Sequence, residues 1–264
     1  MKKFKNLFPN AYTLIGCVHL RPLPGSPGFE GDLNRVYDQA VNEAIILEEC
    51  GVDGIIVENF GDAPFYPDSV PAVTISSMTV AIDRIISKVS IPVGVNVLRN
   101  DAASAISIAK ATDASFVRIN IHMHAMLTDQ GMIQGKSYET LRLRDALQSD
   151  IMILADINVK HAQSLVNPDI IQWTHDLQDR GKVDALIVSG SGTGVGVDIE
   201  ELKLIYQHAA VPVIIGSGFT PGKAHSYLPL SQGAIIGSYF KESGKVTNPI
   251  DVGRVEEVIK SIGR

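Results

Sequence analysis

Ionisable and amide side chains stand at or near the ends of several short apolar runs of the chain. Glu58 ends one such run, Arg118 lies near the end of another, and Asp156 lies near the end of a third. Carboxylates can exchange protons with a substrate, and a guanidinium can neutralise an anionic group. The candidate catalytic residues are Glu58, Asn96, Arg118, Asn120, Asp156, Lys160 and His161.

Each type of side chain in this set suits one step of a reaction. We expect Asp156 or Glu58 to act as the general acid or base. Lys160 would be the electrophile, either as an ammonium or as a Schiff base. The two amides, Asn96 and Asn120, would orient substrate hydroxyl groups.

A structural role is the alternative for the charged members. Burying Arg118 or Asp156 without a partner would cost several kcal/mol, so mutual pairing or the charge of a ligand must offset that cost. An ion pair of Arg118 with Asp156 or Glu58 could therefore serve only to stabilise the fold. A stabilising ion pair accounts for two of these residues. It does not account for five apolar runs that carry amides or charges at the same end.

A second cluster is rich in glycine and follows three later apolar runs. Glycine lets backbone N–H groups approach an anion closely, and in barrel proteins the loops after the last strands often hold a phosphate. Tight turns that need a positive φ angle are the alternative explanation for any single glycine. We predict a phosphate site made by Ser189, Gly190, Gly192, Thr193, Gly216, Ser217, Gly218, Gly237 and Ser238, with Thr193 or Ser191 closing over the ligand.

The elements that must position these groups recur eight times. Each unit is a β-rich run, a polar or glycine-containing turn, and a segment with helical periodicity, which is typical of parallel strands joined by helices. The predicted strands are Thr13–His19, Gly54–Glu58, Pro92–Val97, Ser115–Asn120, Ile151–Asn158, Asp184–Ser189, Pro212–Gly216 and Ala234–Ser238. Eight units without a linker predict a single (β/α)8 TIM barrel over residues 1–264, with a doubly wound open sheet as the alternative.

The helices between these strands carry recognisable signals. The predicted helices include Asn34–Cys50, Ala102–Ala111, Tyr138–Gln148, Asp198–Ala209 and Asp251–Ile262. Gly51 and Gly181 follow helical periodicity, and we expect both to take the left-handed conformation that ends many helices.

Alternation along a strand decides which side chains face the barrel interior. In the strand Ser115–Asn120, Val117 and Ile119 should pack on helices, while Arg118 and Asn120 should face inward. In a barrel, the loops that follow the strands build the functional face. The polar strand ends and the glycine loops are therefore predicted to meet there.

Composition excludes several classes of protein. Of the 264 residues, 45% are hydrophobic and 20% charged, with a net charge of −6, so disorder and a basic nucleic-acid surface are excluded. The two cysteines form no disulfide framework, and no apolar stretch reaches membrane-spanning length. We expect a cytoplasmic protein that binds no nucleic acid, with only peripheral membrane association left open. Barrels often associate through their outer helices, so we also expect a homo-oligomer.

Two glycine-containing motifs resemble nucleotide sites but lack a required feature. The spacing in Gly192–Gly196 differs from that of a dinucleotide fingerprint. The segment Gly131–Ser137 is one residue short of a Walker A loop, and no strand leads directly into it. Both motifs argue against a nucleotide-binding loop.

A metal site is a further alternative. His122 and His124 have the spacing of a metal-binding pair, and His19 and Glu58 end the first two predicted strands. The last predicted strand, however, lacks the aspartate that would complete a metallohydrolase set. We predict no cofactor and no metal, with a divalent metal at these four residues as the alternative. His161 could instead carry a proton near neutral pH.

Six blocks of consecutive residues, spread over essentially the full chain, resemble one family of barrel proteins. The blocks are CVHLRPLPGSP (17–27), VENFGDAP (57–64), GVNVLRNDA (94–102), TDQG (128–131), ADINVKHA (155–162) and GSG (216–218), the last followed by Asn248 and Pro249. Together they are similar to the BtpA/SgcQ family. Several blocks in the same order are far more specific than any one short motif.

The resemblance implies a barrel but no established mechanism. One cyanobacterial member is associated with photosystem I biogenesis at a membrane. A bacterial member, encoded among sugar-transport genes, is described as a nucleoside triphosphatase, which the missing Walker spacing argues against. The family blocks coincide with the predicted strand ends at Glu58, Asn59, Asp62, Asn96, Arg99, Asp101, Asp129, Gln130, Asp156, Lys160 and His161.

We therefore expect an enzyme that acts on a phosphorylated sugar or nucleoside-derived metabolite, as an isomerase or an aldolase-like lyase. Its phosphate would lie in the later glycine loops, and its reacting carbon near the second to fifth strands. The rival hypothesis is a non-catalytic assembly or regulatory factor, which predicts an exposed apolar patch on the outer helices. A nucleoside triphosphatase is the lesser alternative.

Overall fold

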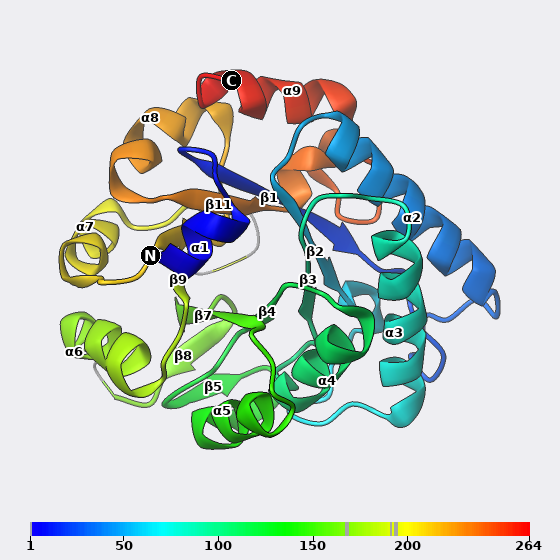
Figure 1. Cartoon of the computed structure of the whole chain (residues 1–264), viewed down its shortest axis with the longest axis horizontal. Helices are drawn as coiled ribbons and strands as arrows, with labels where there is room; N and C mark the ends of the chain where they lie inside the picture. The colour runs from blue at the N-terminus through cyan, green and yellow to red at the C-terminus, as the bar shows by residue number, and fades with distance from the viewer. Residues whose placement is uncertain (1, 167–168, 191, 193–194) are drawn as a thin grey trace.

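Eight parallel strands close into a barrel, and helices surround it (Figure 1). The structure is a computed structural model that describes residues 2–166, 169–190, 192 and 195–264. Around the barrel the strands follow the order β1 (Thr13–His19), β11 (Gly233–Ile236), β10 (Val213–Ile215), β9 (Ala185–Val188), β7 (Met152–Asn158), β4 (Phe116–Ile119), β3 (Val93–Asn96) and β2 (Gly54–Glu58). The predicted (β/α)8 barrel is confirmed, and every predicted strand lies within two residues of an observed one.

The helices lie outside this barrel. They are α1 (Lys2–Leu7), α2 (Leu33–Glu49), α3 (Ala72–Ile86), α4 (Ala102–Thr112), α5 (Ser137–Ala146), α6 (Ile170–His175), α7 (Ile199–His208), α8 (Ala224–Tyr227) and α9 (Val252–Ser261). Short polar side chains explain where many of them begin. The aspartates that accept hydrogen bonds from first-turn N–H groups are Asp32, Asp101, Asp169, Asp198 and Asp251.

The two predicted glycine helix ends behave differently. Gly51 has a φ of +88°, as expected for a left-handed position after α2. The prediction for Gly181 was wrong: its φ is −73°, and Lys182 takes a left-handed φ of +50° instead. Gly181 is needed for close packing, because a Cβ atom there would lie 2.6 Å from the carbonyl oxygen of Leu177.

The amino-terminal end of the barrel interior is apolar and closed. Helix α1, drawn across the centre of the barrel in Figure 1, and the residue that follows it place Phe4 and Phe8 beneath the strands. The ring of Phe8 meets that of Phe116 at a centroid distance of 5.7 Å, edge to face. This layer leaves only the carboxyl end of the barrel interior for polar groups.

Glycine at position 94 makes room for the Phe116 ring in this layer. A Cβ atom on Gly94 would lie 2.2 Å from that ring, whereas one on the loop residue Gly222 would meet nothing within 4 Å. We expect Gly94→Ala to lower the free energy of unfolding by about 1–3 kcal/mol through overpacking. Urea unfolding measures this, with Gly222→Ala as the control. Equal stability of the two variants would show that the interior layer is loosely packed.

A small antiparallel sheet stands outside the barrel and was not predicted from the sequence. It has the order β6 (Gly131–Gln134), β5 (Ala125–Thr128) and β8 (Ala162–Ser164), formed by the segments that follow β4 and β7. The Walker-like segment Gly131–Ser137 runs through β6 and into α5, and the ammonium of Lys136 pairs with Asp68 at 3.2 Å. That segment is therefore no phosphate loop. Among the described residues, no helix is long and apolar enough to cross a membrane.

Candidate functional site

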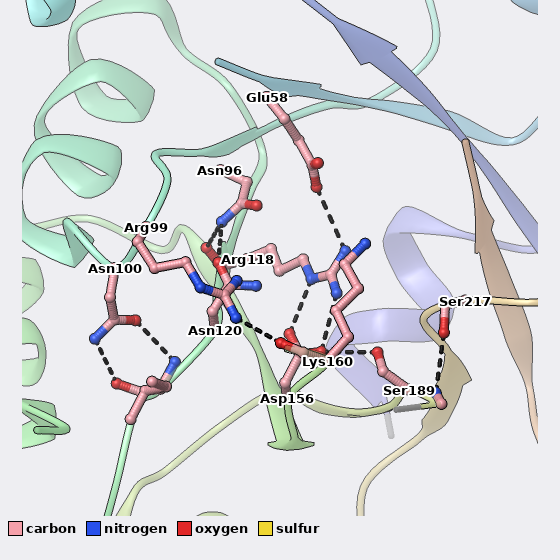
Figure 2. Close-up of polar contacts among 12 residues, drawn as sticks. Glu58, Asn96, Arg99, Asn100, Arg118, Asn120, Asp156, Lys160, Ser189 and Ser217 are labelled. Carbon is pink, nitrogen blue, oxygen red and sulfur yellow. Dashed lines mark hydrogen bonds and ion pairs between the residues drawn. The ribbon is translucent and has the colours of Figure 1, made fainter. Parts of the chain in front are cut away.

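A buried ion network occupies the carboxyl end of the barrel interior (Figure 2). Arg118 donates from Nε and Nη2 to the two carboxylate oxygens of Asp156, each at 2.9 Å, and its Nη1 lies 3.4 Å from Glu58 Oε1. Ser189 Oγ donates to Asp156 at 2.9 Å. Burial alone would lower the pKa of Arg118, but the two carboxylates outweigh it and raise that pKa above its ordinary value. Arg118 is therefore a fixed cation.

The two predicted amides lie beside this network and contact each other. Asn96 Nδ2 donates to Asn120 Oδ1 at 3.0 Å and to the carbonyl oxygen of Arg118 at 2.9 Å. Asn96 Oδ1 is buried and has no hydrogen-bond partner among the described residues. A buried acceptor without a partner is costly, so this oxygen could receive a hydroxyl or N–H group of a ligand.

Lys160 follows β7 and lies near the Arg118 network (Figure 2). Within the described part of the chain, its ammonium makes no ion pair within 4 Å. Burial, followed by the positive charge of Arg118, lowers the pKa of Lys160 below its ordinary value. A lysine in this state has a larger neutral fraction, which is the form that attacks carbonyl groups.

Two adjoining pockets share the side chains of this network. The first, here called the glycine pocket, has a volume of about 150 Å³ and is lined by the loops after β10 and β11. The second, here called the amide pocket, has a volume of about 340 Å³ and is lined by Asn96, Asn120, Arg99, Asp129 and His161 among others. The residues that line both are Glu58, Phe60, Arg118 and Lys160. The two pockets therefore adjoin, with the ion network between them, and together they are here called the cleft.

The predicted phosphate residues separate into two groups. Those that line the glycine pocket are Gly216, Ser217, Gly218, Gly237 and Ser238. Ser189 and Gly190 serve other contacts, since Ser189 bonds Asp156 and the Gly190 N–H donates to Ser217 Oγ at 2.9 Å. Gly192 is not among the described residues that line either pocket, and Thr193 and Ser191 lie outside the described residues.

Two of these glycines also have steric reasons to be glycine. Gly218 has a φ of +68°, and a Cβ atom there would lie 2.4 Å from the carbonyl oxygen of Val195. A Cβ atom on Gly237 would lie 2.6 Å from Cε1 of His19. The turn explanation weighed for single glycines thus applies to Gly218, and Gly237 makes room for a neighbouring ring.

Sequence reasoning missed Arg254. This residue lies on the last helix, α9, and lines the glycine pocket. Its guanidinium stacks on the ring of Tyr239 at 4.2 Å from the ring centroid, and its Nε donates to the Tyr239 carbonyl oxygen. No local motif marks an arginine on an outer helix, so only the fold could place it beside the glycine loops.

One amide and two carboxylates in the family blocks bind backbone N–H groups. Asn59 Oδ1 accepts from the N–H of Leu98 at 2.7 Å, and Asp62 Oδ1 accepts from the N–H of Leu23 at 2.7 Å. Asp101 caps α4 and also accepts from the N–H of Val70. These residues shape the loops around the cleft and line neither the glycine pocket nor the amide pocket.

The histidines proposed for a metal do not assemble as one group. His122 Nε2 lies 2.8 Å from the carbonyl oxygen of Gly181, and His124 stacks on Trp173. Among the described residues, the only group of three possible ligands that come together is Cys17, His19 and Glu58. The four-residue metal site considered from the sequence is therefore not formed.

His161 lies at the rim of the amide pocket with a positive φ of +57°. Burial, followed by the charge of Lys160, lowers the pKa of His161 below its ordinary value. The lowered pKa favours the neutral imidazole, the state needed to accept a proton.

Comparison with known proteins places the chain in a family. The model of the BtpA family matches residues 10–264. An uncharacterized protein of Methanocaldococcus jannaschii is 44% identical over 93% of both chains. The photosystem I biogenesis protein BtpA of Synechocystis is 43% identical over 97% of this chain and 89% of that one.

A likeness to solved structures supports the fold. The (S)-3-O-geranylgeranylglyceryl phosphate synthase of Thermoplasma acidophilum, in complex with sn-glycerol-1-phosphate, superposes with a TM-score of 0.63 at 15% identity, covering 99% of this chain and 97% of that one. At that identity the likeness concerns the barrel alone. The family match over nearly the whole length is the stronger result, and it shows that the chain belongs to the BtpA family.

Proposed function

We propose that this protein is an enzyme that acts on a phosphorylated sugar or nucleoside-derived metabolite, as an isomerase or an aldolase-like lyase. The observation that carries the proposal is the cleft, in which a glycine-lined pocket adjoins a pocket of amides and charges. Both pockets open at the end of the barrel where barrel enzymes perform their chemistry. The phosphate would lie in the glycine pocket and the reacting carbon in the amide pocket.

Electrostatics favour an anionic substrate. Arg254 lines the glycine pocket, and Lys160 and Arg118 stand between the two pockets. Arg118 is neutralised by Asp156 and Glu58, whereas Lys160 has no ion pair among the described residues. A bound phosphate would therefore form its ion pairs with Lys160 and Arg254. The barrel neighbour from Thermoplasma acidophilum is likewise in complex with a phosphorylated small molecule.

The chemical roles follow from the contacts. Lys160, with its lowered pKa, would form a Schiff base with a substrate carbonyl or polarise it as an ammonium. Glu58 has only a long contact to Arg118, at 3.4 Å, and lines both pockets, so it suits the general acid or base better than Asp156 does. Asp156, held at 2.9 Å by Arg118 and by Ser189, would instead orient that arginine. Asn96 Oδ1 would accept a hydroxyl group.

Thermal-shift screening with phosphorylated metabolites tests the phosphate site. We expect a phosphorylated sugar to raise the melting temperature, and its dephosphorylated form to leave it unchanged. Loss of a charged hydrogen-bond partner should make Arg254→Met bind that compound about 10- to 100-fold more weakly. The exposed Arg142→Met is the matched control and should bind as the wild type does. A panel with no phosphate-dependent shift would count against the proposal.

A non-catalytic assembly factor is the second candidate. The relative from Synechocystis carries the name of a biogenesis protein. Large exposed apolar side chains lie on and beside the small antiparallel sheet, including Leu127, Met132 and Leu165, and Val73 and Val80 are exposed seven residues apart on the outer helix α3. This candidate predicts that Asp156→Asn and Lys160→Met restore growth to a host strain that lacks the gene, whereas the enzyme proposal predicts that both fail.

A further inference from the structure

Two neighbouring strands bring three potential metal ligands together beside the glycine pocket. Cys17 and His19 are two residues apart on β1, so their side chains share one face of the strand. Glu58, on β2, is the direct neighbour of His19 in the parallel register. One ligand atom from each of the three side chains lies within 4.8 Å of the other two.

Each of these side chains has capacity left for a ligand. His19 Nδ1 is buried and has no hydrogen-bond partner among the described residues, while His19 Nε2 lies 3.3 Å from Cys17 Sγ. Glu58 uses Oε1 for its long contact to Arg118, which leaves Oε2 for an ion. A metal-bound Glu58 cannot also be the general acid or base, so with the ion in place that role would pass to Asp156, the other carboxylate predicted for it. Cys17 is 3% exposed, yet its side chain lines the pocket. The ring nitrogen that faces Cys17 is Nε2, so an ion would bind there, and Nδ1 would carry the proton of the neutral imidazole.

The imidazole is held in position by its surroundings. The ring of Phe60 packs edge to face on His19 at a centroid distance of 5.0 Å. On the other side, Gly237 leaves the space that His19 Cε1 occupies. These contacts hold the imidazole in one orientation, with Nε2 toward Cys17.

We propose that Cys17, His19 and Glu58 bind one divalent transition-metal ion of the zinc class. A thiolate, an imidazole and a carboxylate are ligands that suit zinc and cobalt, whereas magnesium and calcium require oxygen ligands alone. Three protein ligands leave a fourth position open, as in catalytic rather than structural zinc sites. That position would face the glycine pocket, and binding would displace the proton of the Cys17 thiol.

The charges around the cluster are compatible with such an ion. A thiolate and a carboxylate together neutralise two positive charges. The nearby Arg118 is already paired with Asp156, and the buried Lys241 is paired with Glu43 at 2.5 Å. Lys160 also faces the site, so the fourth ligand should be an anion or an anionic oxygen of a substrate.

Cobalt binding to the untagged protein tests the site without any assumption about the proposed function. After treatment with EDTA and dialysis, the chain should bind about one Co²⁺ ion and develop a thiolate-to-cobalt charge-transfer band in the near ultraviolet. Zn²⁺ should displace the cobalt, abolish the band and raise the melting temperature. Absence of both the band and the thermal shift overturns the proposal.

Single substitutions distinguish this site from adventitious binding. Loss of a hydrogen-bond partner outside the ligand set already weakens metal binding by about 10- to 100-fold, so Cys17→Ser and His19→Gln should weaken cobalt binding at least as much. Cys17→Ser should also remove the charge-transfer band. The matched controls, Cys50→Ser and His124→Gln, should bind as the wild type does. A band that survives in Cys17→Ser, or disappears in Cys50→Ser, overturns the assignment, and circular dichroism of the metal-free variants verifies that they fold.

Discussion

Replacement of Arg118 by methionine is expected to lower the free energy of unfolding by about 3–5 kcal/mol. Among the described residues, Arg118 is the only ion-pair partner within 4 Å of the carboxylates of Asp156 and Glu58. Removing it leaves two buried negative charges with no ion-pair partner within 4 Å in the described part of the chain. Methionine has a similar length and is apolar, so little of the cost should come from a cavity.

Urea unfolding near neutral pH measures this loss. The matched control is Arg35→Met, because Arg35 forms a 2.7 Å ion pair with Glu30 on the surface. Exposed pairs of that kind contribute about 0–1 kcal/mol. If Arg118→Met lowers the free energy of unfolding no more than Arg35→Met does, the ion network is well solvated and does not stabilise the carboxyl end of the barrel.

A triple variant separates the ion pair from its charges. Replacing buried charged networks with neutral groups is often neutral for stability, whereas breaking them is not. Arg118→Met combined with Glu58→Gln and Asp156→Asn should therefore recover much of the stability lost by Arg118→Met alone. If the triple variant is the least stable of the set, hydrogen bonding rather than charge is the main contribution of the network.

The inward-facing polar side chains at the carboxyl end of the barrel were predictable, because the alternation of side chains along a strand is a local property. Val117 and Ile119 pack outward, and Arg118 and Asn120 point inward, as their spacing predicted. The same rule placed Asp156 and Asn96. Which of these residues would bond to one another depended on the register between strands, which the sequence does not encode locally.

Long-range features were not predictable for the same reason. Arg254 reaches the glycine pocket from the last helix, and the buried pair of Lys241 and Glu43 joins segments far apart in the chain. The small sheet of β5, β6 and β8 has strands of only three or four residues. Strands this short show too few alternations to stand out from a loop.

We expect Lys160→Met to stabilise the fold and to abolish turnover. The pKa of Lys160 is lowered, first by burial and then by Arg118, so the folded state disfavours the charged ammonium. Removing that amine should raise the free energy of unfolding by about 0.5–2 kcal/mol at pH 7, as substitutions that relieve a strained functional site commonly do. Lys110→Met, on the exposed face of α4, is the control and should change stability little.

The pH dependence of this stabilisation has a definite sign. Between the folded pKa of Lys160 and its ordinary value of about 10.5, the unfolded chain binds more protons than the folded one, so wild-type stability rises with pH in that window. The advantage of Lys160→Met should be full at pH values below the folded pKa and vanish above about 10.5. An advantage independent of pH would show that packing, and not the charge, is responsible.

The same variant should lose turnover on a phosphorylated substrate by at least about 100-fold, because Lys160 is the only lysine among the described residues that line the two pockets. If the lysine forms a Schiff base, borohydride added with a carbonyl substrate should attach that substrate to the wild-type chain, and peptide mass spectrometry should locate it at Lys160. Lys110→Met should be labelled equally, and Lys160→Met not at all. Undiminished turnover by Lys160→Met would contradict both forms of the electrophile role, the ammonium and the Schiff base. Lost turnover without trapping would assign the lysine to the ammonium role, in which it polarises the substrate carbonyl without forming a covalent bond.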